Sequence, residues 1–174
     1  MRKILFLFAA MLLGSVGLHA GNTITYTASA QLSGFGGNLG VGRTTFGPKI
    51  TSHTFSNGTG TITCNGEITT IGEKAFFDSG LTSITIPNSV TTIGKSAFKW
   101  GSLLTSITLP NSVTTIGDNA FYNCSALTSI TIPNSVTTIE NSAFEACYSL
   151  TSVTVSWTDE KSIPSVMIYA EMGV

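Results

Sequence analysis

Charged residues are scarce in this sequence: Asp, Glu, Lys and Arg together make up 10% of its 174 residues. The eight basic and nine acidic side chains are scattered along the chain, and no segment gathers the basic ones into a stripe. A protein that binds nucleic acid or acidic lipid uses such a stripe to neutralise phosphate groups. The composition therefore argues against a nucleic-acid partner.

Histidine is rarer still, with only His19 and His53 in the chain. No H-x-x-x-H, C-x-x-C or G-x-S-x-G motif occurs, and no glycine-rich loop carries the lysine of a phosphate-binding loop. A nucleophile needs a base and an orienting group, and His53 lies in a Gly/Thr/Ser-rich segment where we expect an ordinary loop residue. We therefore expect no enzyme, no cofactor and no metal site. A hydrolase with an unrecognised site is the last-ranked alternative.

Cysteine occurs three times, as Cys64, Cys124 and Cys147. An odd number leaves at least one thiol without a disulfide partner in a secreted chain. Cys124 and Cys147 hold equivalent places in a repeat described below, so they could pair if neighbouring repeats stack. The interpretation we favour is that each is a small buried filler, because Gly101 holds the same place one repeat earlier.

Long apolar runs are absent except at the N-terminus. Arg2 and Lys3 precede an apolar run over residues 4–13, and Leu18-His19-Ala20 offers a small-residue cleavage site. This order is typical of a secretory signal peptide, and the run is too short to span a bilayer as an ordinary helix. We expect residues 1–20 to be removed, which leaves six basic and nine acidic residues and no transmembrane segment. The protein is then expected outside the cytoplasm.

Repetition is what the sequence has in abundance. The segment LTSITIPNSVTTIG (81–94) returns as LTSITLPNSVTTIG (104–117) and again as LTSITIPNSVTTIE (127–140). Complete 23-residue units cover 81–103, 104–126 and 127–149, with a partial unit after them and a shorter one before. A fixed period of this length is the signature of a solenoid, in which each repeat forms one coil of a stack.

The first half of each unit favours extended structure. Apolar and polar residues alternate in SITI (83–86), which predicts a strand with Ile84 and Ile86 inward. Pro87 cannot donate to a sheet and should end that strand. The next segment, VTTI (90–93), favours a second short extended piece. We expect the interior to be sealed by residues of the type Leu81, Ile84, Ile86, Val90, Ile93 and Phe98.

The second half of each unit favours a bend and a turn. Gly94 and Gly117 suit a tight bend, and Glu140 in the same position implies either backbone strain or a bend that is not left-handed. In DNAFYNC (118–124), Ala120, Phe121 and Cys124 would share one face of a single helical turn.

The unit LTSITLPNSVTTIGDNAFYNCSA (104–126) resembles the 23-residue repeat of BspA-like leucine-rich-repeat surface proteins of host-associated bacteria. The resemblance covers residues 64–155, and Pro, Gly, Ala-Phe and Cys all recur in register. It implies a β-rich, right-handed solenoid of about four to five coils, with one short strand and one helical or 3₁₀ turn per coil. It also implies adhesion to host or matrix proteins, or to other cell-surface proteins, and a location at the cell surface or outside the cell.

The expected organisation has four parts. Residues 1–20 form the signal peptide, and residues 21–63, which resemble the family's N-terminal capping segment, form a β cap. The leucine-rich-repeat solenoid covers 64–155. Residues 156–174 form a short C-terminal cap, and because only VTVSWTDEKSIP (153–164) resembles the start of the family's closing segment, we expect that cap to be truncated.

One candidate binding surface is the part of the coil that varies between repeats. A surface that binds one specific protein should differ from coil to coil, because its target is not periodic. Variation surrounds the Ala-Phe pair, and exposed aromatic residues often dominate the affinity of an interface. We name as the variable edge Lys99, Trp100, Tyr122, Asn123, Glu145 and Tyr148. The alternatives are that these are unselected solvent positions, or that Trp100 covers a gap left by Gly101.

The other candidate is formed by the outward residues of the repeated strand, which stacking would align into two ladders of hydroxyl groups. Such an array could bind a repetitive target such as a glycan, although Ser and Thr also simply suit the wet surface of a sheet. We name as the hydroxyl face Ser83, Thr85, Ser106, Thr108, Ser129, Thr131, Ser152 and Thr154. The sequence therefore predicts an exported, non-enzymatic interaction protein, with a glycan-binding module as the alternative.

Overall fold

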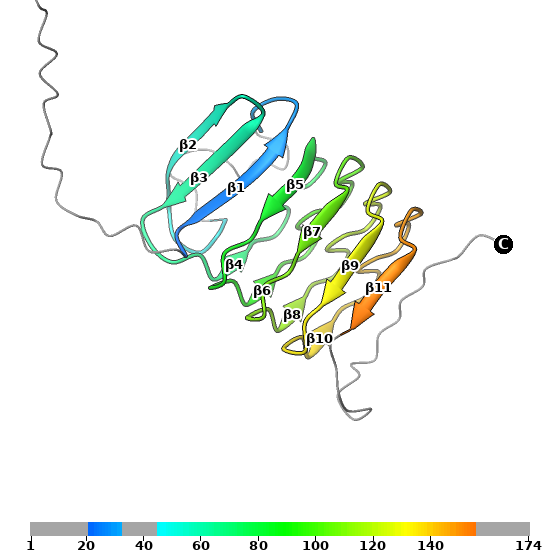
Figure 1. The fold of residues 1–174 in the computed structure, drawn as a ribbon. Helices are drawn as coiled ribbons and strands as arrows, with labels where there is room; N and C mark the ends of the chain where they lie inside the picture. The colour runs from blue at the N-terminus through cyan, green and yellow to red at the C-terminus, as the bar shows by residue number, and fades with distance from the viewer. Residues whose placement is uncertain (1–20, 33–44, 156–174) are drawn as a thin grey trace, which may run out of the picture.

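The structure is a computed structural model that describes residues 21–32 and 45–155. The chain forms a stack of coils preceded by an antiparallel β unit (Figure 1). Each coil contributes one strand to each of two walls. The strands are β1 (Thr23–Ala28), β2 (Ile50–Ser56), β3 (Thr59–Cys64), β4 (Thr70–Ile71), β5 (Leu81–Thr85), β6 (Thr92–Ile93), β7 (Ser106–Thr108), β8 (Thr115–Ile116), β9 (Ser129–Ile132), β10 (Thr138–Ile139) and β11 (Ser152–Val155).

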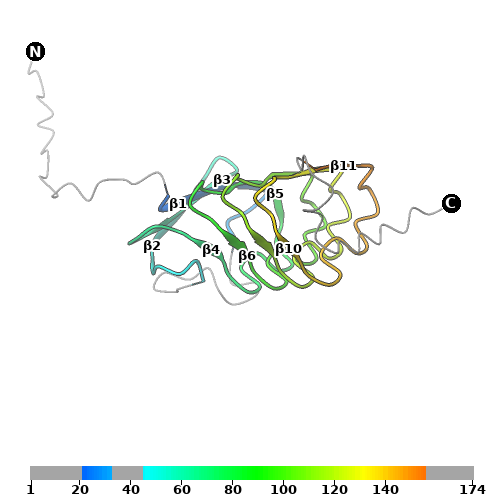
Figure 2. The ribbon, with the colours of Figure 1, turned by 90° about the horizontal axis from the view of Figure 1, so that it is seen from below.

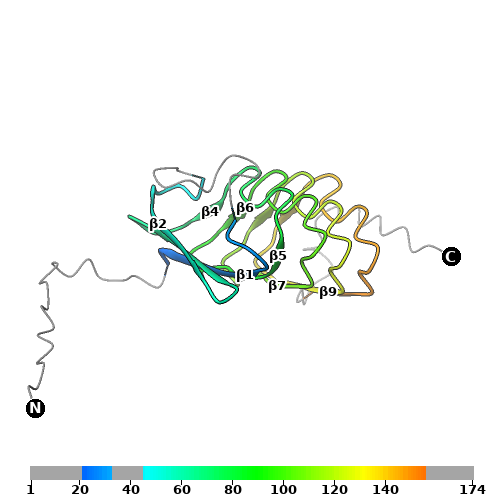
Figure 3. The same ribbon diagram turned by 90° about the horizontal axis from the view of Figure 1, so that it is seen from above.

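The two walls are parallel sheets whose registers follow the repeat. In the first wall β5 pairs with β7 and β9 pairs with β11, while β7 lies against β9. In the second wall the order is β4, β6, β8, β10. Every pairing joins equivalent residues, for example Ile84 with Ile107 and Ile93 with Ile116. Figures 2 and 3 show the coils following one another along the stack, and Figure 3 shows β5, β7 and β9 on the same side. The expected β-rich repeat solenoid is confirmed.

The antiparallel unit covers the N-terminal end of the first wall. Strands β1, β2 and β3 form an antiparallel sheet in the order β2-β3-β1, and β1 pairs antiparallel with β5 of the first coil. Its inward residues alternate along β1, where Ile24 and Tyr26 are buried. The exposed edge that a first coil would otherwise present is therefore paired, which is how β proteins avoid edge-to-edge aggregation.

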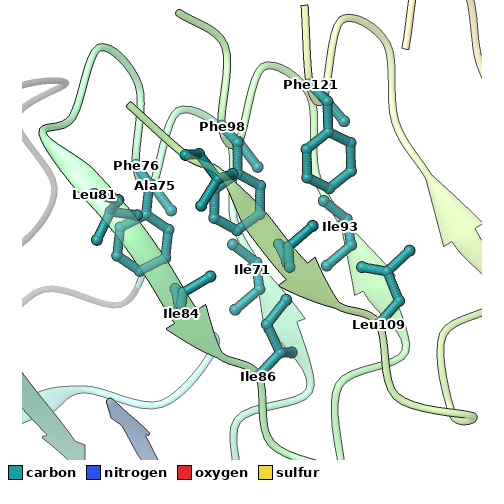
Figure 4. Packing of buried hydrophobic residues seen from close by; sticks show 14 of the residues in the cluster. Ile71, Ala75, Phe76, Leu81, Ile84, Ile86, Ile93, Phe98, Leu109 and Phe121 are labelled. Carbon is teal, nitrogen blue, oxygen red and sulfur yellow. The ribbon is translucent and has the colours of Figure 1, made fainter. Parts of the chain in front are cut away.

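The interior is a single apolar column built from the repeated positions. Ile84, Ile86 and Val90 are each at most 6% exposed, as the alternating pattern predicts. A stack of phenylalanine rings runs through all coils, with centroid separations of 5.1 to 5.3 Å between Phe76, Phe98, Phe121 and Phe144. Figure 4 shows the first three of these rings in line, with the aliphatic residues of both walls packed beside them. Phe46 extends the stack into the N-terminal unit.

The segment around the phenylalanine is not helical, which corrects the expected helical or 3₁₀ turn. The described residues contain no helix, and residues 95–100 form consecutive tight turns. Ser96 and Trp100 have positive φ angles of 53° and 68°, and the same positions are left-handed in the other coils. Alternate amides then point out of the coil: Phe98 N–H donates to Ala120 C=O in the next coil at 2.8 Å. A helix would have used that amide within its own turn.

The repeated glycine also has a different role from the one expected. Gly94 and Gly117 are not among the residues with positive φ. A Cβ atom on Gly117 would lie 2.9 Å from both the Gly94 carbonyl carbon and the Lys95 nitrogen. The glycine is therefore required because adjacent coils approach closely, and not because the bend is left-handed.

Glu140 shows how the array accommodates the missing glycine. Its amide still donates to Ile116 C=O at 2.9 Å, and its carboxylate accepts the Asp118 N–H at 2.8 Å. The neighbouring Ile139 is only partly buried, whereas Ile93 and Ile116 are fully buried. Glu140 therefore replaces the glycine in a coil whose neighbouring isoleucine is less tightly buried, and its carboxylate adds a hydrogen bond to the preceding coil.

Repeated hydroxyl groups hold adjacent coils together. Ser112 Oγ donates to Val90 C=O at 2.6 Å, and Ser135 Oγ donates to Val113 C=O at 2.7 Å. Threonines do the same two residues further along the chain, where Thr114 Oγ1 donates to Thr91 C=O at 3.2 Å. The PNSVTT segment is therefore repeated because each coil uses these hydroxyls to bind the carbonyl groups of the coil before it.

Two expected parts of the chain, the signal peptide (1–20) and the C-terminal cap (156–174), lie outside the described residues. Among the residues that are described, no helix has the length and apolarity needed to cross a membrane.

Replacement of Gly117 by Ala should destabilise the stack. The added methyl group would meet backbone atoms of the previous coil, and overpacking of this kind costs about 1–3 kcal/mol. Gly80→Ala is the matched control, because nothing lies within 4 Å of a Cβ built there. We expect that control to be neutral or stabilising by up to about 1 kcal/mol. Urea denaturation of both variants measures the difference, and equal stability would contradict the close-approach argument.

Candidate binding surfaces

The hydroxyl face is a regular array on the outside of the first wall. Ser83 lies beside Ser106 and Thr85 beside Thr108, and the same register joins Ser152 to Ser129. The alternation of the strands turns these side chains outward, while Ile107 and Ile130 between them are buried. The outward hydroxyls are therefore aligned within the strand pairs β5–β7 and β9–β11, at the spacing of hydrogen-bonded strands.

The hydroxyls of this face differ in their bonding. Thr27 Oγ1, from the N-terminal unit, lies 2.7 Å from Ser83 Oγ, so the first hydroxyl of the serine ladder is already bonded. The other seven make no side-chain hydrogen bond within the described residues. Unlike the hydroxyls of the PNSVTT segment, they contribute nothing to stacking and remain available to solvent or to a partner.

Trp100 is the most distinctive residue of the variable edge. Its side chain is 48% exposed, and its ring stacks against Phe77 of the preceding coil with centroids 6.3 Å apart and planes inclined by 23°. Its φ of 68° is left-handed, a conformation in which a bulky residue is an outlier. The equivalent positions carry Asp78, Asn123 and Ala146. The fold thus does not require an aromatic residue there.

Gly101 lies against the next coil through Cys124. A Cβ atom on Gly101 would lie 3.4 Å from Cys124 Sγ and 3.0 Å from Phe98 O. The sulfur atom would thus be in contact with a side chain at position 101, and the tighter approach is to the Phe98 carbonyl oxygen.

The rest of the variable edge lies on the coils that follow. Lys99 Nζ sits 4.4 Å from the centre of the Tyr122 ring and 3.5 Å from Asn119 Oδ1. Backbone hydrogen bonds of 2.8 Å join Trp100 to Tyr122 and Asn123 to Glu145, so these residues lie next to one another in the same turn of successive coils. Tyr148 is 77% exposed.

Two apolar contributors to this region are not among the residues named as the variable edge. Phe77 is the stacking partner of Trp100, and Leu103 is 50% exposed. The available signal for Leu103 was its position, because the corresponding residues in the next two units are Ala126 and Ser149. A large apolar residue at an otherwise small or polar position marks the same coil as Trp100.

All three cysteines are free thiols in the interior. Cys124 Sγ donates to Phe98 C=O at 3.2 Å, and Cys147 Sγ donates to Phe121 C=O at 3.1 Å. Burial raises the pKa of Cys64 and of Cys147 to about 11. All three cysteines are buried packing residues, and Cys124 and Cys147 also bond the preceding coil. No Cys124–Cys147 disulfide is present.

His53 is not an ordinary loop residue, which corrects the sequence expectation. It lies on β2, and its Nε2 is 2.8 Å from the Tyr26 hydroxyl group, which also accepts the Leu32 N–H at 3.2 Å. Burial lowers the pKa of His53 and raises that of Tyr26. The hydrogen bond between the two side chains ties β1 to β2 across β3. The part of the chain that the structure describes holds no cluster of three or more metal-ligating side chains.

A family model for the BspA-type leucine-rich-repeat region matches residues 48–169 in six copies, which is more than half of the chain. The chain belongs to this family. No curated protein matches it. The repeat seen in the sequence and the stacked coils of the structure are therefore those of BspA-type leucine-rich repeats.

Three solved structures are similar to this chain. A leucine-rich repeat protein from Bacteroides capillosus is 36% identical with a TM-score of 0.50, over 60% of this chain and 71% of that one. A leucine-rich repeat protein from Bacteroides ovatus is 31% identical with a TM-score of 0.41, over 59% and 31%. A leucine-rich cell surface protein from Faecalibacterium prausnitzii is 26% identical with a TM-score of 0.46, over 58% and 34%. The chain thus spans about a third of the last two.

Acid should weaken the N-terminal β unit through His53. Its folded pKa lies below the ordinary value of 6.5, so the unfolded chain takes up a proton first as the pH falls. The stabilisation is therefore complete above pH 6.5 and declines as the pH falls from there through the folded pKa. NMR titration of the His53 ring measures that pKa, and His53→Gln should remove this part of the acid dependence. A pKa at or above 6.5 would contradict the assignment.

Proposed function

We propose that this protein is an exported, non-enzymatic interaction protein that binds host or matrix proteins through the variable edge. Membership of the BspA-type leucine-rich-repeat family supports a role in protein interaction. The relative from Faecalibacterium prausnitzii is described as a cell surface protein. A location at the cell surface or outside the cell is part of the proposal.

The observation that carries the proposal is the conformation of Trp100. A half-exposed indole is held at a φ of 68°, at a turn where Asp78 and Asn123 stand in neighbouring coils. Asp and Asn tolerate the left-handed region far better than an aromatic residue. Backbone strain of this kind costs on the order of 1–3 kcal/mol and concentrates at functional sites. An exposed, strained aromatic residue that the fold does not need is best explained by binding.

The surroundings of Trp100 are those of an interface centre. Phe77 supports the indole from one side, and Leu103 adds exposed apolar surface in the same coil. Polar and charged residues of the following coils, including Asn123 and Glu145, form a rim. Aromatic anchors surrounded by such a rim are typical of residues that dominate binding.

Trp100→Asn should separate binding from folding. Asn suits the left-handed turn, so relief of strain offsets the lost stacking on Phe77, and we expect stability within about 1 kcal/mol of the wild type. Binding of residues 21–174 to immobilised extracellular-matrix protein should weaken at least about tenfold, as for an interface hot spot. Surface plasmon resonance and thermal melting measure the two quantities.

Tyr122→Ala should weaken the same interaction. Val155→Asn is the control, because Val155 is 42% exposed and lies outside the variable edge. Retention of matrix binding by Trp100→Asn would refute the proposed surface.

A second candidate function, glycan binding, is favoured by the free hydroxyls of the first wall. Apart from Ser83, these hydroxyls have no partner among the described residues, and adjacent strands hold them in register. A periodic set of donors and acceptors suits a target that is itself periodic, such as a polysaccharide. This candidate uses the first wall, whereas the variable edge lies in the turns beside the phenylalanine, so separate substitutions distinguish the two.

The glycan hypothesis predicts that residues 21–174 bind defined spots on a glycan array. Thr108→Val combined with Thr131→Val removes two hydroxyls while retaining the shape and strand preference of the side chains. Binding should fall several-fold, whereas Thr115→Val in the second wall should leave it unchanged. A blank array with the unsubstituted protein would reject the hypothesis.

A further inference from the structure

We propose that Asp78 and Trp100 together bind an arginine side chain, so that the variable edge selects partners with an exposed basic segment. The inference deepens the proposed function and rests on it. It concerns the chemistry of the partner, which family membership does not specify.

The positive charges near this surface are already satisfied within the molecule. Lys95 Nζ is 3.0 Å from Asp118 Oδ2, a contact that raises the pKa of the lysine and lowers that of the aspartate. Lys74 Nζ is 3.8 Å from Glu73 Oε1. Lys99 lies over the Tyr122 ring. An acidic partner would have to compete with these internal contacts.

Two exposed carboxylates near this surface make no such internal contacts. Asp78 and Glu145 are exposed, and neither carboxylate makes an ion pair or a side-chain hydrogen bond within the described residues. The Tyr122 ring does not neutralise Lys99, so two unpaired carboxylates stand against one unpaired lysine and the surface keeps a net negative charge. Opposite charge across an interface steers association and selects partners.

Asp78 and Trp100 occupy the same turn position in consecutive coils. Their φ angles are 48° and 68°, and the Asp78 N–H donates to Lys99 C=O at 2.8 Å. Equivalent residues of hydrogen-bonded neighbours lie about 5 Å apart. The turn thus places the Asp78 and Trp100 side chains at the same position of consecutive coils, about one strand spacing apart at the backbone.

This pairing suits a guanidinium group better than other cations. A planar guanidinium stacks on an indole and directs its forked N–H donors to a carboxylate, whereas an ammonium group lacks both the plane and the fork. The molecule already holds one cation over an aromatic ring of the variable edge, because the Lys99 ammonium group lies over the Tyr122 ring. Trp100 has no internal cation among the described residues, so a partner can supply one.

The test titrates residues 21–174 with short synthetic peptides and follows the fluorescence of Trp100. For this experiment Trp157 is replaced by Phe, so that Trp100 is the only tryptophan in the protein. The probes are glycine-spaced peptides that carry arginine, lysine or citrulline, the last being the uncharged analogue of arginine. The arginine peptide should bind in a saturable way, about tenfold more tightly than the citrulline peptide and more tightly than the lysine peptide.

Asp78→Asn should weaken the arginine peptide several-fold and leave thermal stability unchanged. Glu67→Gln is the matched control, because it removes an exposed carboxylate away from the edge. Equal binding of arginine and citrulline peptides, or equal effects of the two substitutions, would overturn the inference. The same variants in the matrix assay separate the two proposals: loss with Trp100→Asn but not with Asp78→Asn leaves the surface valid and refutes arginine recognition. Retention with Trp100→Asn refutes the surface itself.

Discussion

The distance between successive coils is the constraint on which the structure depends. Backbone hydrogen bonds set it in both walls and again in the turns, where every second amide donates to the next coil. The phenylalanine rings stack at 5.1 to 5.3 Å, close to the spacing of paired strands. Gly94 and Gly117 follow from that distance, because a Cβ atom at either position would lie 2.9 Å from a backbone atom of the preceding coil. Glu140 takes the equivalent position only in the coil whose neighbouring isoleucine is less buried. A single coil would leave all of these groups without partners.

The same constraint divides the repeated residues into those that build the stack and those that are free for other uses. The serines and threonines of the PNSVTT segment bind carbonyl groups of the preceding coil, so their repetition has a structural cause. In the turn beside the phenylalanine, alternate backbone amides bond the next coil in each repeat, whereas the side-chain contacts between coils, such as Lys95 with Asp118 and Lys99 with Asn119, differ from repeat to repeat. The side chains of this turn can therefore vary without loss of stacking, and Trp100, Tyr122 and Glu145 lie at these variable positions. A repeat protein can thus keep its framework constant while it changes its binding surface.

Much of the framework could be predicted from the sequence. The alternation in SITI placed Ile84 and Ile86 inward, and the period predicted the parallel register that joins Ile84 to Ile107. The helical turn was predicted wrongly, because the spacing of Ala, Phe and Cys suits one helical face as well as a run of tight turns. Only the neighbouring coil, which accepts alternate amides, favours the turns. His53 was assigned to a loop for a similar reason, since its partner Tyr26 is 27 residues away.

The sequence alone determined that the chain stacks, which residues face the interior and which positions are free to vary, because period and hydrophobic pattern are local properties that recur in every coil. The tertiary structure decided how those positions are used. It showed that the glycines allow close approach, that Cys124 and Cys147 bond carbonyl groups of the preceding coil, and that Trp100 is exposed against Phe77 in a strained turn. Each of these facts depends on contacts between residues of different coils, and the distance between coils is a property of the assembled stack.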